Sequence, residues 1–485
     1  MYFKKEIIAL ALVFCMPVFA QDVTQQEVIQ QDAPLQNDEN IDVVAAVEEV
    51  DNEVGEQSDK DVNKVAEERD TQLEIEGKIE SYKLKVQNSL AKQGKTHSAF
   101  VYSGTADITV DKNDPSWSAY RTMAMKEAMA RARESYLQEL NVSTQSSTLN
   151  RLANKSGMPP ATIDDFKTES SSMAIRNKVV AAIGGKLDAE LEDLGINPEE
   201  YKAAPPKKRG DYLKASITEQ TKRTAYGNLS GMFLIKTFEV MKNNGEGTVG
   251  VVMAMSLKKK KLLKALIDSK GNIQPDETKA DSKFTTMSNY LVSKKEGLYL
   301  KSGTNIKYDE LGYPFIISYG QAGVKFSTNS QIRSMERKVA KPYAINDAWA
   351  NLARTYNLSG KFSAETSQSK SNTTETISRL VNNNVETTQS DTVSSLISEM
   401  TQMSKTSASI KGLTGVKIEY TWSKKHPITG KEIVGAVIVW HPVSVRNAID
   451  LANNVTHKEA EPKDAEKTQS VHSAESEDMF DAADF

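Results

Sequence analysis

The feature that most constrains this chain of 485 residues is an apolar pattern that occurs twice. In each copy, small residues lead into Leu-x-Gly, and two apolar runs separated by a polar turn follow. Leu229 and Gly231 open the first pair of runs, and Leu413 and Gly415 open the second. Two apolar runs joined by a short turn are typical of a β-hairpin. The chain is therefore predicted to build two similar modules around two hairpins.

An alanine-rich helix is expected ahead of each hairpin, at residues 120–140 and 341–356. Ala128 in the first helix and Ala348 in the second belong to rows of alanines spaced four apart, which form a smooth ridge on one face. Such a ridge lets a helix lie close against a sheet. These elements predict an α+β fold with two similar modules. Each module has a small, mainly antiparallel sheet, an alanine-rich helix and a helical insert, and disordered acidic ends flank the pair.

The strands follow from residue patterns. We expect hairpins at 231–240 with 248–256 and at 415–422 with 432–440, and closing helices at 258–267 and 443–452. The continuous apolar run from Val249 to Met255 predicts a central strand buried on both faces. Further strands are expected at 99–110 and 323–327. The expected segments are a signal peptide at 1–20, a disordered acidic linker at 21–61, a helix at 62–95, a first module at 96–268 with a helical insert at 141–213, a connector at 269–313, a second module at 314–454 with a Ser/Thr-rich insert at 358–404, and a disordered acidic tail at 455–485.

Two readings of the helix at 62–95 stay open: it packs on the first module, or it forms a short coiled coil or docks on a partner. The N-terminus has the order of a secretory signal, with two lysines, an apolar run and a small-residue site ending at Ala20. Cleavage there would give a periplasmic or secreted protein that begins at Gln21 and has no cysteine. The alternative is an outer-membrane lipoprotein anchored through Cys15, which the bulky Phe14 before it disfavours.

The order of strand, alanine-rich helix, variable helical insert and hairpin resembles the N-terminal domain of flagellar H-ring proteins of the FlgT type, and a related domain of small surface lipoproteins. The matching stretches are 103–140 with 224–257 and 319–356 with 407–440. The resemblance implies a small α/β sandwich, export, and structural work in envelope machines. It brings no catalytic residues with it.

The sequence contains no motif for catalysis, a cofactor or a metal. The chain lacks Gly-x-Ser-x-Gly, a phosphate-binding loop and His-Glu-x-x-His, so we expect no enzyme and no cofactor. A formal net charge of −4 with acidic ends argues against nucleic acid as a partner. No mature segment is apolar enough to span a membrane. The histidines are scattered, not spaced as metal ligands, at His97, His426, His441, His457 and His472.

The C-terminal residues carry aromatic side chains among acids. Met479, Phe480 and Phe485 lie among Asp478, Asp481 and Asp484. A frayed end and a short docking peptide with apolar anchors both fit this pattern.

The leading hypothesis is an exported, non-enzymatic scaffold or accessory protein of a bacterial envelope assembly (secretion, pilus, conjugation or flagellar type). Its partners would be envelope proteins, and a homo-oligomer fits the pattern. A secreted surface or matrix-binding protein is the alternative, and exposed aromatic residues on the hairpins, such as Tyr420, Trp422 and Trp440, would favour it.

Overall fold

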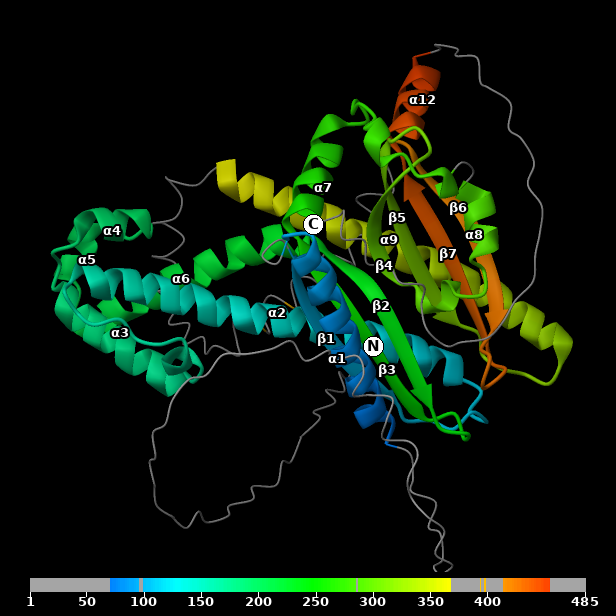
Figure 1. Ribbon diagram of the computed structural model, residues 1–485, viewed down its shortest axis with the longest axis horizontal. Coiled ribbons are helices and arrows are strands. Elements are labelled where there is room, and N and C mark those ends of the chain that lie inside the picture. Colours follow the sequence, from blue (N-terminus) through cyan, green and yellow to red (C-terminus); the bar gives the residue numbers. More distant parts are fainter. Residues whose placement is uncertain are drawn as a thin grey trace, which may run out of the picture. The chain divides into compact units, whose positions relative to one another are not determined.

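A computed structural model describes residues 70–95, 99–284, 287–367, 393, 397 and 413–453. All of them belong to one compact unit, residues 68–485. Helices and two small antiparallel sheets make up this unit, which confirms the predicted α+β class (Figure 1). Within the described part of the chain, no helix is both long and apolar enough to cross a membrane.

The first sheet consists of β1 (Ala99–Ile108), β2 (Met232–Met241) and β3 (Gly247–Ser256). Its strand order is β1-β3-β2, and both pairings are antiparallel. Helix α2 (Trp117–Lys155) covers one face and α1 (Thr71–Lys92) covers the other (Figure 1). Every residue of the central strand β3 is buried, so the predicted two-face burial is confirmed.

Helix α1 forms because its sequence supplies both a cap and an apolar stripe. The Asp70 carboxylate accepts hydrogen bonds from the Gln72 and Leu73 amides at the helix start. Its buried residues are spaced by three or four, which places them on one face of a helix. That face packs on Phe238 and Val252 of the sheet. The sequence left two readings of this helix open. In the structure, the helix packs on the first module. The buried apolar residues of α1 are Ile75, Ile79, Tyr82, Val86 and Leu90.

The second sheet has the order β4-β5-β7-β6 and is also antiparallel. Its strands are β4 (Gly303–Tyr308), β5 (Pro314–Gly323), β6 (Val416–Lys425) and β7 (Glu432–Trp440). Helix α9 (Ser330–Ser367) covers one face. The short helices η3 (Ser282–Phe284), α8 (Met287–Ser293) and η4 (Leu298–Leu300) cover the other. Strand β4 lies in the stretch expected to be a connector, and it extends the sheet by one strand.

The order β1-β3-β2 of the first sheet matches β5-β7-β6 of the second in register as well as in sequence order. Gly104 of β1 lies opposite Val251, and Gly320 of β5 lies opposite Ala436. The register shifts by one residue between Leu234 and Lys236 in β2, and again between Ile418 and Tyr420 in β6. Both sheets therefore carry a β-bulge two residues after the start of the equivalent strand.

The alanine ridges meet the sheets at glycines. A Cβ on Gly104 would come within 3.0 Å of the Ala128 oxygen and the Ala132 nitrogen. A Cβ on Gly320 would do the same with the Ala344 oxygen and the Ala348 nitrogen. Ala128 and Ala348 thus both lie at the expected helix–sheet contacts, but Ala128 is equivalent to Ala344, and Ala348 to Ala132.

The helices run further than their apolar periodicity predicts. Helix α2 continues to Lys155, and α9 begins at Ser330, eleven positions before the expected start. The strand expected at 323–327 is wrong, because β5 ends at Gly323. The closing helices are α7 (Leu257–Ser269) and α12 (Pro442–Ala452).

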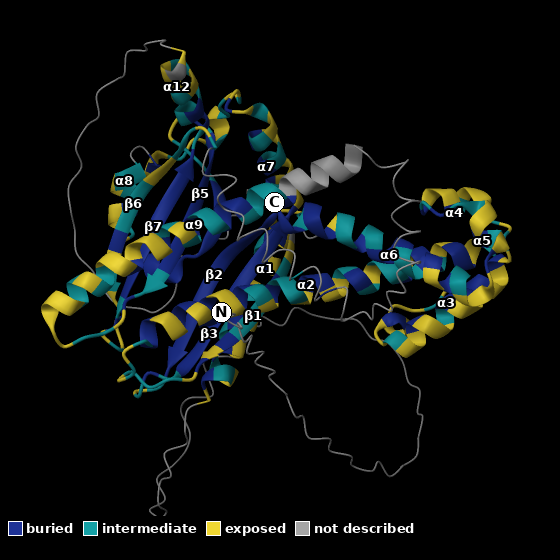
Figure 2. Ribbon diagram, turned by 180° about the vertical axis from the view of Figure 1, so that it is seen from behind, coloured by how far each residue is buried: buried dark blue, intermediate teal, exposed yellow. Residues whose placement is uncertain are grey.

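The insert of the first module is an arm with its own core. It comprises the end of α2 together with η1 (Asp164–Phe166), α3 (Glu169–Ile183), α4 (Asp188–Asp193), α5 (Pro198–Ala203) and α6 (Pro206–Leu229). Phe166, Val179 and Tyr201 are fully buried in this core. The arm extends away from both sheets (Figure 1), and its outer surface is largely exposed (Figure 2).

Candidate functional site

Ionisable and polar side chains meet where the two modules touch. We call this group the junction cluster: Arg121, Glu239, Tyr299, Gln321 and His426. The first module supplies Arg121 from α2 and Glu239 from β2, and the second supplies Tyr299 from η4, Gln321 from β5 and His426 from the turn between β6 and β7. The arginine, glutamate and histidine side chains are completely buried.

Arg121 is the centre of the junction cluster. Its Nε donates to Glu239 Oε1 at 2.7 Å, and its Nη2 also contacts that carboxylate. Nη1 donates to Gln321 Oε1 at 2.6 Å, and Nη2 donates to the Tyr299 carbonyl at 2.6 Å. One guanidinium therefore bonds a strand of its own module and two elements of the other module. A planar guanidinium with five donors suits such a junction.

His426 completes the junction cluster from the second module. Its Nε2 lies 3.1 Å from Glu239 Oε2. Its ring packs against Trp117 of α2, with centroids 4.9 Å apart, and against Tyr299 at 5.5 Å. The Trp117 indole donates to the Gly245 carbonyl at 2.8 Å, which fixes the ring. This aromatic enclosure keeps water away from the charged groups.

Two opposing effects set the pKa of Glu239. Burial disfavours the charged carboxylate and would raise the pKa. The charge of Arg121 and the hydrogen bond from His426 more than offset this, so the pKa of Glu239 lies below its ordinary value of 4.5. The junction cluster therefore holds an ionised glutamate in the interior at neutral pH.

The depressed pKa of Glu239 predicts a dependence of stability on pH. The stabilisation is fully present above pH 4.5, the ordinary value, and is lost as the pH falls through the lower folded pKa. We expect the difference in unfolding free energy between the wild type and Glu239→Gln to be largest at pH 7 and to shrink below pH 4.5. Urea titrations at several pH values would measure it. Glu127→Gln, an exposed change on α2, should show no comparable difference; an equal difference at pH 7 and pH 3 would contradict the expectation.

The junction cluster cannot receive a substrate, because its charged atoms are sealed on every side. What it can do is fix the orientation of one module on the other. A buried pair of charges has a strict geometry, and any displacement leaves a charge without a partner. Gly323 adds to the fit, since a Cβ there would meet the backbone of Ser118 and Ala119 at the start of α2. These contacts join β5 and the turn between β6 and β7 of the second module to α2 and β2 of the first.

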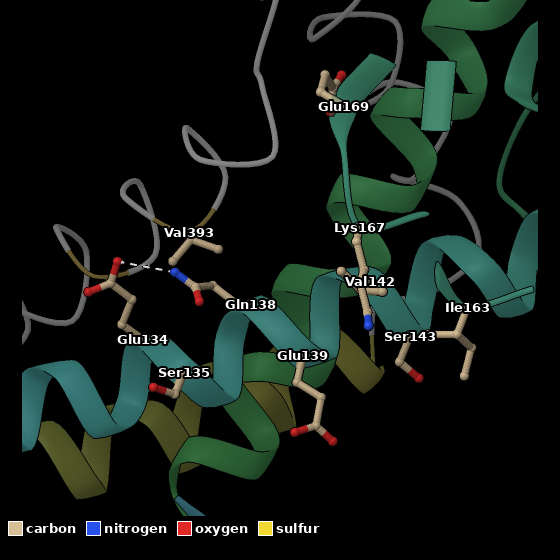
Figure 3. Close-up of a pocket in the computed structure, with 10 residues that line it drawn as sticks. All are labelled: Glu134, Ser135, Gln138, Glu139, Val142, Ser143, Ile163, Lys167, Glu169 and Val393. Carbon is tan, nitrogen blue, oxygen red and sulfur yellow. Dashed lines mark hydrogen bonds between the residues drawn. The ribbon is translucent and has the colours of Figure 1, made fainter. Parts of the chain in front are cut away.

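An open groove of about 860 Å³ runs along α2 toward the arm (Figure 3). Glu134, Gln138 and Glu139 lie along one side of it, and Gln138 donates to Glu134 at 3.4 Å. Lys167 and Val393 contribute to its other walls. Glu134, Glu139 and Glu169 make the groove acidic, and Ser135 and Ser143 also line it. Among the described residues, no three His, Cys, Asp or Glu side chains could together hold a metal ion.

The first half of α9 exposes an apolar stripe. Four large side chains, spaced by three or four residues, lie on one face and are 46–65% exposed. The opposite face of the same segment packs Ala340 and Ala344 on the second sheet. Residues 331–343 also carry four cations and a single acid, Glu336. We call this surface the α9 face; its apolar residues are Ile332, Met335, Val339 and Tyr343.

The glycines predicted to shape the modules occupy equivalent places. Gly231 lies against Lys260 of α7, and Gly415 lies against Val445 of α12, so each glycine lets the hairpin approach the closing helix. Gly415 also has a φ of +83°, which favours glycine. The predicted docking residues Met479, Phe480 and Phe485 lie outside the described residues.

Sequence reasoning missed the junction cluster. In the sequence, His426 is one of the scattered histidines, and its pairing with Glu239 over 187 positions has no local signal. Two signals were available in principle. Glu239 is the one acid in a strand of mainly apolar residues. Arg121 lies seven residues before Ala128, on the helix face that packs inward. Both residues break the apolar pattern at positions that must be buried.

Comparison with known proteins gives two likenesses. Residues 172–268, from α3 to α7, match a family described as a domain of unknown function (DUF6844). The crystal structure of a hypothetical protein from Francisella tularensis is similar with a TM-score of 0.43 and 18% identity, over 78% of this chain and 93% of that chain. Among curated proteins, none matches this chain.

Proposed function

We propose that this protein is an exported, non-enzymatic scaffold of a bacterial cell-envelope assembly, and that it holds partner proteins on a rigid two-module body. The observation that carries the proposal is the α9 face. A contiguous exposed apolar stripe on a well-packed helix is typical of a protein–protein contact. The sealed junction cluster supports the same reading, because it favours a fixed geometry between modules. The resemblance to flagellar H-ring proteins supports the envelope.

The chemistry of the α9 face indicates what it binds. Apolar anchors at a spacing of three and four suit a second helix or a short peptide with large apolar side chains. The excess of Arg and Lys around the stripe favours an acidic partner. Residues 475–485 of this chain have that composition, with five acids, no cation, and Met479, Phe480 and Phe485. We therefore propose an acidic, aromatic peptide as the occupant, and the C-terminal segment of another copy as its first candidate.

A photo-crosslinking amino acid at Val339, in cells that express the full chain, would test this. We expect a discrete adduct in the envelope fraction. The chain recovered in that fraction should begin at Gln21. Met335→Lys should reduce its yield by at least about tenfold, since a charge in the stripe disfavours an apolar contact. Mass spectrometry of the crosslinked peptide then identifies the occupant, and deletion of 475–485 removes the adduct if the tail is bound.

The matched control is the same amino acid at Leu73, which is 67% exposed on α1 outside the α9 face. Equal adduct yields from both positions would mean nonspecific contact and would contradict the proposal. The absence of an adduct would also contradict it. So would a chain that stays in the cytosol and keeps its first twenty residues.

Exposed aromatic residues on the hairpins would have favoured the alternative function as a surface- or matrix-binding protein, but the two tryptophans of the second hairpin are not exposed. Trp422 and Trp440 are buried in the cores of the second module, at 6% and 4% exposure. They contribute to packing of the sheet rather than to an exposed aromatic row.

A further inference from the structure

Two arginines share a small cavity between the long helices of the two modules. Arg133 comes from α2 and Arg354 from α9. The cavity has a volume of about 20 Å³, and β4 closes one side of it at Gly303 and Thr304. Its remaining walls are largely apolar and include Met129, which lies one helical turn before Arg133. The site is separate from the junction cluster, since the two share no residue.

Among the described residues that line this cavity, the two arginines are the charged ones, and none is an Asp or a Glu. Arg133 makes one long hydrogen bond, from Nη1 to the Met129 carbonyl at 3.5 Å. Arg354 Nη1 donates to the neutral Asn351 amide at 2.9 Å. The nearest acid that acts on Arg354 is Asp347, which already binds Lys126 at 2.7 Å.

The presence of two cations in one cavity shifts the pKa of Arg133. Burial, with a further contribution from Arg354, lowers the pKa of Arg133 to about 9. Both effects disfavour a second cation at the site. The Arg133 side chain nevertheless stays protonated at neutral pH, so two positive charges line one cavity with largely apolar walls. Charges in such surroundings interact strongly with any anion that enters, because little water screens them.

We propose that Arg133 and Arg354 form a binding site for one oxyanion group, a phosphate or a carboxylate, held between the two modules. Guanidinium groups bind both anions with paired N–H donors. A cavity of about 20 Å³ holds a group about the size of a water molecule. One oxygen of the oxyanion therefore enters the cavity, and the rest of the group lies outside it. This proposal is independent of the scaffold function.

Isothermal titration of the mature chain would test the site, with inorganic phosphate and acetate as probes at constant ionic strength in chloride. We expect saturable binding of at least one probe. Arg133→Met and Arg354→Met should each weaken it at least about tenfold, since each removes one half of the paired donors. Arg151→Met, an exposed arginine further along α2, serves as the control and should leave binding unchanged.

The unfolding midpoint in chloride distinguishes a ligand site from a structural arginine. Without an oxyanion, Arg133→Met should not lower the midpoint, because the change removes a repulsive charge and leaves no acid behind. Preference for phosphate or for acetate identifies which oxyanion the site takes. Failure of both probes to bind, binding that survives in Arg133→Met, or loss of folding in that variant would each overturn the proposal.

Discussion

Arg121→Met is expected to lower the free energy of unfolding by about 3–5 kcal/mol, because it leaves the ionised Glu239 buried without its main partner. The Arg121 and Glu239 side chains have no exposed surface. Water therefore cannot replace the lost hydrogen bonds, as it would at a surface. The change also removes two hydrogen bonds between the modules, since the same guanidinium binds Gln321 and the Tyr299 carbonyl of the second module.

The chain contains its own control for this experiment. Arg337 on α9 occupies the position equivalent to Arg121, seven residues before Ala344 as Arg121 is seven before Ala128. It pairs with Glu432, but its side chain is 41% exposed. We expect Arg337→Met to lower the unfolding free energy by less than about 1 kcal/mol, because solvent screens the pair.

Denaturant titrations of both variants, with the double variant Arg121→Met and Glu239→Gln, would separate the contributions. We expect the double variant to be more stable than the sum of the two single losses predicts, since removing both charges leaves neither unpaired. Equal losses at Arg121 and Arg337 would mean that the junction cluster is no more important than a surface pair.

The elements that local pattern determines could be predicted from the sequence. Both hairpins, the alanine ridges and the buried central strand follow from runs of apolar residues with period two or four, and each was placed within a few residues. The ends were less well placed, because α2 runs past Leu140 into the arm with polar residues that carry no strong period. Strand β4 was missed because Gly303–Tyr308 is a short polar stretch whose burial comes from packing against β5.

The candidate sites could not be predicted in the same way, because they depend on contacts between distant residues. Arg121 and Gln321 are 200 positions apart, and Arg133 and Arg354 are 221 apart. Each of these arginines, taken alone in the sequence, is an ordinary helix residue. Only the way the second module packs on α2 makes Arg121 a bonded partner of that module. The same packing places Arg133 beside Arg354, with no acid among the described residues that line their cavity.

Gly104→Ala and Gly320→Ala are expected to destabilise the two modules by about 3 kcal/mol or more each. At both positions the added methyl group would collide with backbone atoms of the alanine ridge, which cannot rotate away as a side chain can. Relief requires the whole helix to move off the sheet, and this opens the core that the ridge closes.

The comparison with Gly77→Ala makes the test specific, since a Cβ on Gly77 meets nothing within 4 Å on the exposed side of α1. There alanine should raise the unfolding free energy by about 0.5–1 kcal/mol through helix propensity. Melting and denaturant curves should show lower stability for Gly104→Ala and Gly320→Ala and higher stability for Gly77→Ala. If the two modules are equivalent bodies, the losses at Gly104 and Gly320 should be similar, because both glycines face the same pair of ridge positions. A neutral effect at either glycine would mean that its helix and sheet are not in the close contact that the equivalence requires.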